Sequence, residues 1–323
     1  MAYRLGEGPL ELRDALVEEL CRLSGEDESV VVLDADLSRS SGLFRYRERF
    51  PDRFFNCGVQ EANMMGVAGG LSSMGFVPVV HSFASFASRR ATDQVFVSCL
   101  YSRQNVKIIG SDPGICNAAN GGTHLAYEDL GIMGSLPGMQ IVDFTDAVMI
   151  RDVLPQILSA PGTFYMRLFR KTKVQVYLEG ERFTLGRAKR VREGRDLTLI
   201  AAGAVSIPEA LAAAELLSSR GIEAEVVDMF TLKPLDRECV IRQAERTGAL
   251  MTVDNHNALN GLGAAVADVI ARERLNVPFV TLGIPDTCGE VGTVDYLKAK
   301  YGIDRQSIVE AAERLMRMKA GQR

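Results

Sequence analysis

Residues 61–83 read EANMMGVAGGLSSMGFVPVVHSF, and this stretch decides the fold class. Its first part, residues 61–74, predicts a helix, and the small residues of that helix would allow close packing against a neighbour. Its last part, residues 77–83, is a short apolar run typical of a buried strand. A helix followed directly by a buried strand is one unit of an alternating α/β pattern.

The same alternation continues in both directions along the chain. Further strands are expected at residues 30–34, 106–110, 140–144, 164–168, 197–203, 223–229, 249–255 and 278–284. Further helices are expected at residues 11–23, 86–103, 126–135, 146–158, 206–220, 236–247, 262–274 and 305–318. We therefore predict an α/β protein of two successive domains, each a mostly parallel sheet flanked by helices. The expected boundaries are a first domain at 1–172, a charged connector at 173–190 and a second domain at 191–323.

Composition narrows the class of protein. The 323 residues suit two domains, and a net charge of -4 argues against a nucleic-acid or membrane-surface role. No apolar run is long enough to span a bilayer, and the first residues lack a signal-peptide core, so we expect a cytoplasmic protein. The six cysteines and three histidines are too scattered for a metal site, and we expect reduced thiols and no metal ligands from this chain.

Glu61 stands where a loop meets the Gly- and Ala-rich helix. A carboxylate there interacts favourably with the helix N-terminus, and from the pattern alone a helix-start acid is the simpler interpretation. The surrounding segment, NCGVQEANMMGVAGGL (56–71), resembles the glutamate-bearing motif of transketolases, G-I-x-E-x-N-M-x-G-x-A-x-G-x. In that family the glutamate bonds the N1′ nitrogen of the aminopyrimidine ring of thiamine diphosphate. The resemblance implies that Glu61 binds and activates this cofactor.

A second segment, HSFASFASRRATDQV (81–95), is similar to the family stretch T-F-x-x-F-x-x-R-A-x-D-Q. By this resemblance Phe83 and Phe86 line the pocket of the flat pyrimidine ring, and Arg89 joins the cofactor-binding residues. Aromatic walls suit an aromatic ligand through offset or edge-to-face stacking. Without the neighbouring glutamate motif, two core phenylalanines would be the simpler interpretation.

Two more segments extend the resemblance over nearly the whole chain. LDADLSRSSGL (33–43) is similar to the family's G-S-A-D-L-x-x-S, which implies that Asp36 faces the thiazolium side of the cofactor and that Ser40 contacts the substrate phosphate. VDNHNALNGLGAAVADVI (253–270) resembles the V-E-x-H-x-x-x-G-L-G-x-A-V-A motif of the transketolase C-terminal domain. The four motifs occur in the family's order.

One family motif does not occur in this sequence. Transketolases hold the diphosphate through Mg²⁺ with a G-D-G motif, and no G-D-G is present among the 323 residues. A diphosphate needs a cation with oxygen ligands. We therefore expect an N-terminal transketolase subunit to supply the diphosphate- and Mg²⁺-binding domain, in an α2β2 hetero-oligomer.

The substrate side departs from the family pattern. The Gly- and Asn-rich stretch SDPGICNAANGGTH (111–124) corresponds to T-H-D-x-x-x-x-G-E-D-G-P-T-H-Q, so His124 matches a histidine that contacts substrate oxygens and can exchange protons near neutral pH. Asp112 stands where the family has a phosphate-contacting histidine. Asn120 stands where the family has an aspartate that reads a sugar hydroxyl. An aspartate repels phosphate, so these changes predict an altered substrate geometry.

Three arginines complete the expected substrate site. Arg170 aligns with the family's phosphate-binding arginine, Arg167 lies close to it in sequence, and Arg13 aligns with another phosphate contact. A guanidinium fork suits phosphate. For any one arginine taken alone, a solvated surface charge is the simpler interpretation.

The resemblance predicts the C-terminal subunit of a split transketolase. It would transfer a two-carbon ketol unit from a ketose, expected to be a sugar phosphate, to an aldose, with Glu61 and His124 as catalytic residues. Three alternatives remain at this point: a 2-oxoacid dehydrogenase beta subunit, a relative of deoxyxylulose phosphate synthase, and a non-catalytic regulatory half. The motifs at 33–43 and 56–71 favour the transketolase.

Overall fold

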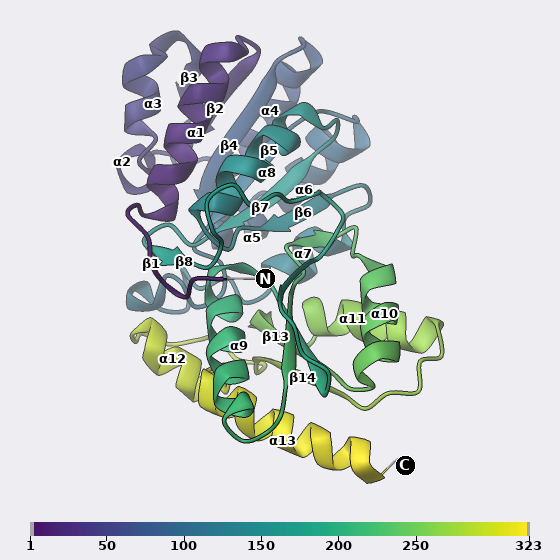
Figure 1. Cartoon of the computed structure of the whole chain (residues 1–323). Helices are drawn as coiled ribbons and strands as arrows, with labels where there is room; N and C mark the ends of the chain where they lie inside the picture. The colour runs from purple at the N-terminus through teal and green to yellow at the C-terminus, as the bar shows by residue number, and fades with distance from the viewer. Residues whose placement is uncertain (1–2, 322–323) are drawn as a thin grey trace.

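The computed structural model describes residues 3–321, which form two α/β units stacked one above the other (Figure 1). The first half contains β1 (Gly6–Glu7), α1 (Leu12–Glu26), β2 (Val30–Asp34), α2 (Ser38–Ser41), α3 (Phe44–Arg49), β3 (Phe54–Asn56), α4 (Glu61–Ser73), β4 (Val77–Phe83), α5 (Ala84–Arg89), α6 (Thr92–Gln94), β5 (Lys107–Ser111), α7 (Asp129–Ser135), β6 (Gln140–Asp143), α8 (Ala147–Ser159), β7 (Phe164–Leu168) and β8 (Val174–Gln175). The second half contains β9 (Lys189–Arg192), β10 (Leu197–Ala201), α9 (Gly203–Ser218), β11 (Ala224–Asp228), β12 (Thr231–Lys233), α10 (Arg237–Thr247), β13 (Leu250–Asn257), α11 (Leu262–Arg272), β14 (Phe279–Ile284), α12 (Val294–Tyr301) and α13 (Arg305–Gly321).

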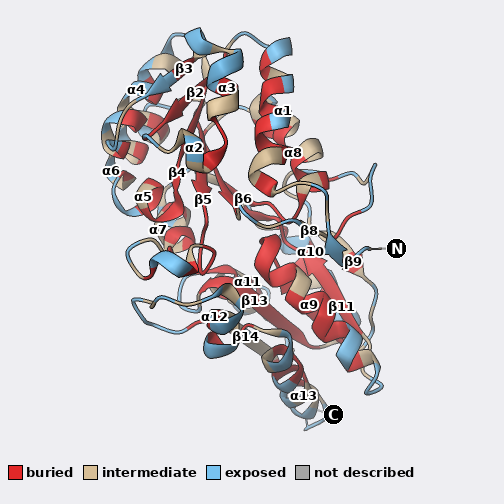
Figure 2. Cartoon of the chain, turned by 90° about the vertical axis from the view of Figure 1, so that its left-hand side faces the viewer, coloured by how far each residue is buried: buried red, intermediate tan, exposed pale blue. Residues whose placement is uncertain are grey.

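The first sheet has seven strands in the order β12-β6-β7-β5-β4-β2-β3. All its neighbours run parallel except β12, which pairs antiparallel with β6 at one edge. Every residue of β2, β5 and β7 is buried, as is usual for parallel strands that helices cover on both faces (Figure 2). This sheet is the one that residues 30–34, 77–83, 106–110 and 164–168 predict.

The second sheet has five strands in the order β14-β13-β10-β11-β9. The pairings from β14 to β11 are parallel, and β9 closes the edge antiparallel to β11. The expected α/β class, with two mostly parallel sheets flanked by helices, is confirmed. Within residues 3–321 the structure has no helix that is both long enough and apolar enough to cross a membrane.

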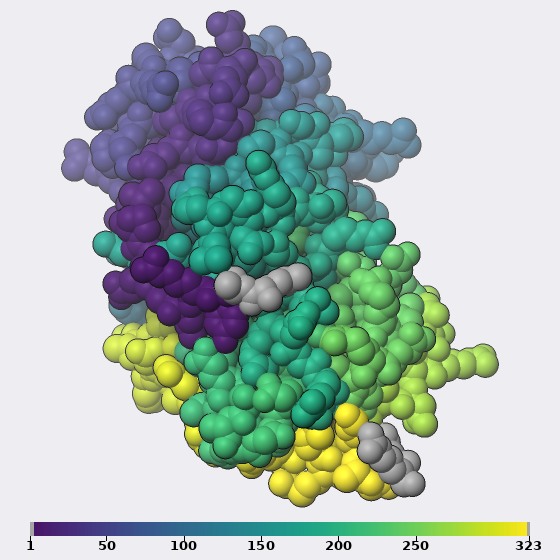
Figure 3. Space-filling model, viewed as in Figure 1, coloured from purple at the N-terminus to yellow at the C-terminus, as the bar shows by residue number. Residues whose placement is uncertain are grey.

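Two segments cross between the halves, and no sequence pattern predicted either crossing. Strand β12 follows β11 in the chain yet completes the first sheet rather than the second. At the other end of the chain, the segment that begins at Tyr3 lies across the boundary between the halves (Figure 3), and the Tyr3 hydroxyl donates to Glu215 in α9 at 2.8 Å. The two halves are therefore joined at several places besides the covalent connector.

The single helix expected at 86–103 is broken into three pieces. Helices α5 and α6 are followed by a π-helical segment, Val95–Tyr101. Two hydroxyl groups bond backbone carbonyls one turn earlier: Ser88 bonds Ala84 at 2.6 Å, and Thr92 bonds Ser88. Such side-chain bonds compete with the helical ladder and bend helices.

Candidate active site

The predicted site residues gather at the carboxyl ends of neighbouring parallel strands. Asp36 follows β2, Phe83 ends β4, Asp112 follows β5 and Arg170 lies two residues beyond β7. These four strands are adjacent in the order β7-β5-β4-β2. Open α/β sheets bind ligands at this edge, because the loops that leave parallel strands meet there.

Glu61 is the first residue of α4, and its side chain is only 1% exposed. One carboxylate oxygen accepts a hydrogen bond from the Ser82 hydroxyl at 3.0 Å. The other oxygen is bound by a guanidinium nitrogen of Arg90 at 2.8 Å. A buried carboxylate at a helix start is thus held on two sides, by β4 and by the segment after α5.

Three aromatic rings form a cluster beside this carboxylate. Phe83 and Phe86 lie edge to face, with ring centroids 5.9 Å apart. The imidazole of His124 packs against both rings, at 5.9 Å from Phe83 and 5.2 Å from Phe86. The structure therefore brings the loop histidine against two phenylalanines that lie far from it in the sequence.

Arg90 connects the carboxylate to the aromatic cluster. Its guanidinium lies over the Phe86 ring, 4.4 Å from the centroid, while it bonds Glu61. Sequence reasoning named Arg89 and missed Arg90. Counting back from Asp93 in the R-A-x-D-Q letters would have selected Arg90, since Arg90 directly precedes Ala91.

Arg89 is oriented differently from its neighbour. It forms an ion pair with Glu128 and donates to the backbone carbonyl of Leu125. Its contacts therefore hold the segment that follows His124, and within residues 3–321 it neither pairs with Glu61 nor lies over a phenylalanine ring.

A buried ion pair lies on the other side of Phe83. The Arg170 guanidinium lies 4.5 Å over the Phe83 ring and binds the Asp112 carboxylate at 2.5 and 2.9 Å. Both residues are 3% exposed. Arg170 also donates to the carbonyl and the hydroxyl of Ser40, and Arg13 donates to the same Ser40 carbonyl at 2.9 Å. Four predicted substrate residues are thus in direct contact.

The charges of this second cluster cancel. Arg13 is paired with Glu11 at 2.7 Å, as Arg170 is paired with Asp112. Asp112 has a backbone φ of +54°, a conformation that aspartate and asparagine adopt more readily than most residues. Its carboxylate also accepts the backbone N–H of Arg170 at 2.9 Å, so both residues are fixed in place.

Asp36 and Asn120 lie at the exposed rim of the site. Asp36 has a positive φ of 62° and exchanges two hydrogen bonds with Asn56, each of 3.1 Å. Asn120 ends a short 3-10 turn within the 111–124 loop. Neither residue touches the aromatic cluster in the part of the chain that the structure describes.

Sequence reasoning did not single out His81, although it is buried beneath the site. Its two ring nitrogens each lie 3.0 Å from a partner, Asp34 on β2 and the Ser111 hydroxyl on β5. The other oxygen of Asp34 accepts the backbone N–H of Leu37 at 2.5 Å. This network links three adjacent strands at the point where their site-bearing loops begin.

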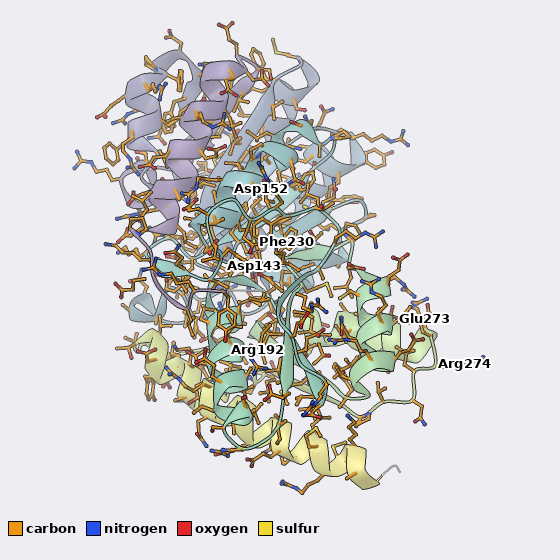
Figure 4. The ribbon with its side chains drawn as sticks, in the orientation of Figure 1. Asp143, Asp152, Arg192, Phe230, Glu273 and Arg274 are labelled. Atoms are coloured by element: carbon orange, nitrogen blue, oxygen red, sulfur yellow. The ribbon has the colours of Figure 1, made fainter. Side chains whose placement is uncertain are left out.

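Arg167, which is also expected among the substrate residues, has other bonding partners than Arg13, Ser40, Asp112 and Arg170. Its fully buried guanidinium bonds Asp129 at 2.9 Å, Asp143 at 2.5 Å and the backbone carbonyl of Asn255 at 3.0 Å. Asp143 lies near the boundary between the two halves (Figure 4). Burial raises the pKa of the Asp143 carboxyl to about 6, although Arg167 opposes the shift. Arg167 thereby links Asp129 and Asp143 of the first half to Asn255 of the second half.

No group of three or more His, Cys, Asp or Glu side chains in residues 3–321 has a geometry that could hold a metal ion. The charged clusters of the site are instead closed by arginine–carboxylate pairs.

Two protein families match this chain over most of its length. The family described as "Transketolase, pyrimidine binding domain" matches residues 8–173, and "Transketolase, C-terminal domain" matches residues 186–308.

Individual relatives agree with these matches. A 6-deoxy-6-sulfo-D-fructose transketolase subunit from Clostridium sp. (strain MSTE9) is 45% identical over 95% of both chains. One of the subunits of an apulose-4-phosphate transketolase from Phocaeicola vulgatus is 34% identical over 93% of this chain and 96% of its own. The solved structure of a split gene transketolase, described as an inactive beta4 tetramer, superposes with a TM-score of 0.87 at 38% identity, covering 97% of this chain and all of that chain.

Proposed function

We infer, from the premise that this chain belongs to the transketolase family and is the C-terminal subunit of a split transketolase, that residues at the strand ends described above perform its ketol transfer. The reaction moves a two-carbon unit from a ketose to an aldose, in carbohydrate metabolism. Two relatives that match over nearly their full length are named as transketolase subunits, so a 2-oxoacid dehydrogenase beta subunit and a regulatory half are not favoured.

The buried Glu61 carboxylate beside three aromatic rings is the observation that carries this proposal. We propose that the site binds thiamine diphosphate, whose thiazolium stores the electrons released when the ketose C–C bond breaks. The residues fit its flat pyrimidine ring: Phe83 and Phe86 offer ring faces and edges, and Glu61 offers a carboxylate that can share a proton.

The proposed roles follow from the surroundings of each side chain. Glu61 holds or releases a proton at its Oε2 atom, which is now bound by the half-exposed Arg90. Because 47% of the Arg90 side chain is exposed, its guanidinium can move into solvent when a ligand atom takes its place beside Glu61. His124 rests against the phenylalanine rings and is half-buried, so its imidazole can exchange protons with substrate oxygens. Asp36 is proposed to face the cofactor from the rim, and Arg89 to contribute through the loop it holds.

The distal end of the sugar is proposed to meet Ser40, Arg13 and Arg170, with Asn120 at the rim. The two relatives are named for substrates with a sulfo or a phosphate group. In this chain Asp112 neutralises Arg170, which weakens the attraction for a dianion. We therefore propose that Asp112 shifts recognition from phosphate charge towards hydroxyl groups, and that a sugar phosphate is a permitted but not a required donor.

A partner chain is proposed to complete the cofactor site. Mg²⁺ and the ligands of the diphosphate would come from an N-terminal transketolase subunit, in an α2β2 assembly. Exposed apolar side chains occur on and around the helix that begins with Glu61: they are Phe55, Val59, Val67, Met74, Val97 and Tyr101. An apolar surface next to an incomplete polar site is typical of an obligate interface.

Two further parts of the proposal concern the chain as a whole. The domain division is proposed at residues 173–190, which lie between the two matched families except for residue 173 and residues 186–190. All six cysteines are free thiols, which suits the reducing cytoplasm.

Calorimetry with thiamine diphosphate and Mg²⁺ tests the proposal. The titration is made on this chain alone and on its mixture with an N-terminal-half transketolase protein, with Glu61→Ala as the matched variant. Binding only in the mixture, weakened by the substitution, is expected. Tight binding by this chain alone would contradict the divided site.

A further inference from the structure

The loop that carries His124 belongs to the first half by sequence but rests on the second half. A separate hydrophobic cluster contains the loop residues Ile115, Cys116, Ala118, Leu125 and Tyr127 together with residues Val205, Ile284, Leu297, Tyr301 and Ile303 of the second half. The two larger cores of the molecule contain none of these ten residues. The apolar support of this loop therefore comes from residues of the second half and is separate from the two larger cores.

Asn255, near the end of β13, holds the beginning of the loop. Its side-chain oxygen accepts the backbone N–H of Ile115 at 2.9 Å, and its amide group donates to the carbonyl of Pro113 at 3.1 Å. A Cβ atom on Gly114 would lie 2.1 Å from the same side-chain oxygen, so only glycine permits this approach. Asn255 is 4% exposed, and its hydrogen bonds have little competition from water.

The segment 287–292 holds the end of the loop. The backbone N–H of Gly292 donates to the carbonyl of Ala118 at 3.1 Å. A Cβ atom on Gly122 would lie 2.3 Å from the carbonyl oxygen of Cys288, and Gly121 has a φ of +71°. His124 follows two residues later, and its backbone N–H donates to Gly121 at 2.9 Å. The second half therefore contacts the loop before His124 through its backbone, while Arg89 of the first half holds the carbonyls of Thr123 and Leu125 on either side of His124.

We propose that Asn255 and the segment 287–292 are positioning elements of the ketol transfer: the second half places His124 against the rings of Phe83 and Phe86. The effect on ketol transfer rests on the proposed function. The statement that the second half holds the loop does not. The Gly- and Asn-rich loop 111–124 has little regular structure to fix its end. Misplacement of a catalytic group by about 1 Å costs on the order of 10²-fold in rate.

Asn255→Ala is the principal test, with Thr198→Val as its matched control. Thr198 is also buried in the second sheet and loses one hydrogen bond, to Thr247 at 2.9 Å, but it does not contact the loop. Amide hydrogen exchange on the isolated chain is expected to rise about tenfold in residues 111–125 for Asn255→Ala and to stay unchanged there for Thr198→Val. In the complex with the N-terminal subunit, kcat/KM for the ketose should fall at least tenfold, while cofactor affinity stays within twofold.

Gly122→Ala provides a second variant in case Asn255→Ala does not fold, with Gly6→Ala, which has open space around it, as control. The same pattern of exchange and kinetics is expected. Unchanged exchange in residues 111–125 overturns the proposal, and so does raised exchange with kcat/KM within twofold of the parent. If the parent complex transfers no ketol unit, the proposed function fails, while the exchange experiment still decides whether the second half holds the loop.

Discussion

The two ends of the cluster around Phe83 are built differently. At one end Glu61 and the rings of Phe83, Phe86 and His124 form a largely apolar setting around one carboxylate. At the other end Arg170 and Asp112 form a buried ion pair that Ser40 and Arg13 extend. The first end keeps the family's residue types, whereas the second end has an aspartate where the family has a histidine.

This difference indicates which part of the reaction each end serves. A buried carboxylate among aromatic rings suits a flat heterocycle such as the pyrimidine ring of the proposed cofactor. Arg170 paired with Asp112 presents little net charge to a substrate. The charge that a substrate meets at this end therefore depends on the residue at position 112. The cofactor end is therefore expected to determine whether the reaction occurs, and the Asp112 end to determine which sugar reacts.

The largest expected effect comes from the cofactor end. Glu61→Ala removes the buried carboxylate that contacts Arg90 and Ser82, and we expect ketol transfer by the reconstituted complex to fall about 10³-fold, within the usual range for loss of proton transfer. Steady-state rates and complex formation by size-exclusion chromatography measure the two effects separately. Glu18→Ala, at an exposed position of α1, is the control. Full activity of Glu61→Ala in an intact complex would show that Glu61 is not needed for ketol transfer and that the two ends do not differ as proposed.

A change of preference is expected at the other end. Asp112→Asn tolerates the positive φ but frees the charge of Arg170, so the ratio of kcat/KM for a phosphorylated ketose to that for its unphosphorylated form should rise about tenfold. Rates with both sugars at several concentrations measure this ratio, and Asp52→Asn on the surface is the control. An equal change with both sugars would mean that Asp112 has only a structural role.

Asp228 is a buried aspartate whose partners are hydroxyl groups, whereas the partner of Asp112 is an arginine. Asp228 accepts hydrogen bonds from the Thr145 and Tyr177 hydroxyls at 2.5 and 2.8 Å, and burial raises its pKa to about 8. The unfolded carboxyl has a pKa of about 3.9. Between these values the folded chain holds a proton that the unfolded chain has released, so the contribution to stability falls as pH rises from about 4 to 8, by at most about 1.4 kcal/mol per pH unit.

Asp228→Asn should remove this dependence, because the amide does not ionise. Urea unfolding of the isolated chain at pH 5, 6, 7 and 8 measures it. The free energy of unfolding should fall less steeply with pH in the variant than in the parent. Parallel curves would show that Asp228 is ionised in the folded chain throughout this range.

The smallest expected effect lies outside both ends. Cys288 is exposed and lines a pocket of about 630 Å³ with Arg89 and Thr123, beside His124. Alkylation of the Cys288 thiol with iodoacetamide adds bulk close to Gly122, which approaches the Cys288 backbone. We therefore expect a two- to threefold loss of ketol transfer by the complex. Cys288→Ser should resist the reagent. Equal inactivation of the variant would assign the effect to another thiol, such as the half-buried Cys57.

The sequence by itself determined the fold class and the order of most elements, and it singled out Glu61, Phe83, Phe86 and His124, which the structure brings together. Short apolar runs bounded by turn residues indicate buried strands, and apolar residues at helical spacing indicate helices; both patterns recur along the chain. Local patterns did not predict the short helices α2, α3 and α12 or the breaks after α5, because those depend on hydroxyl-to-carbonyl bonds and neighbouring packing.

Only the tertiary structure decided how the arginines are used. Arg167 and Arg170 are close in sequence and equally suited to phosphate. Arg167 nevertheless bonds two aspartates of the first half, away from the site, whereas Arg170 bonds Asp112 in the site. The same holds for Arg89 and Arg90, of which only the second reaches Glu61 among the described contacts. A charged side chain carries no sequence signal for its partner, because the partner is distant in the chain and becomes a neighbour only when the strands and loops are assembled.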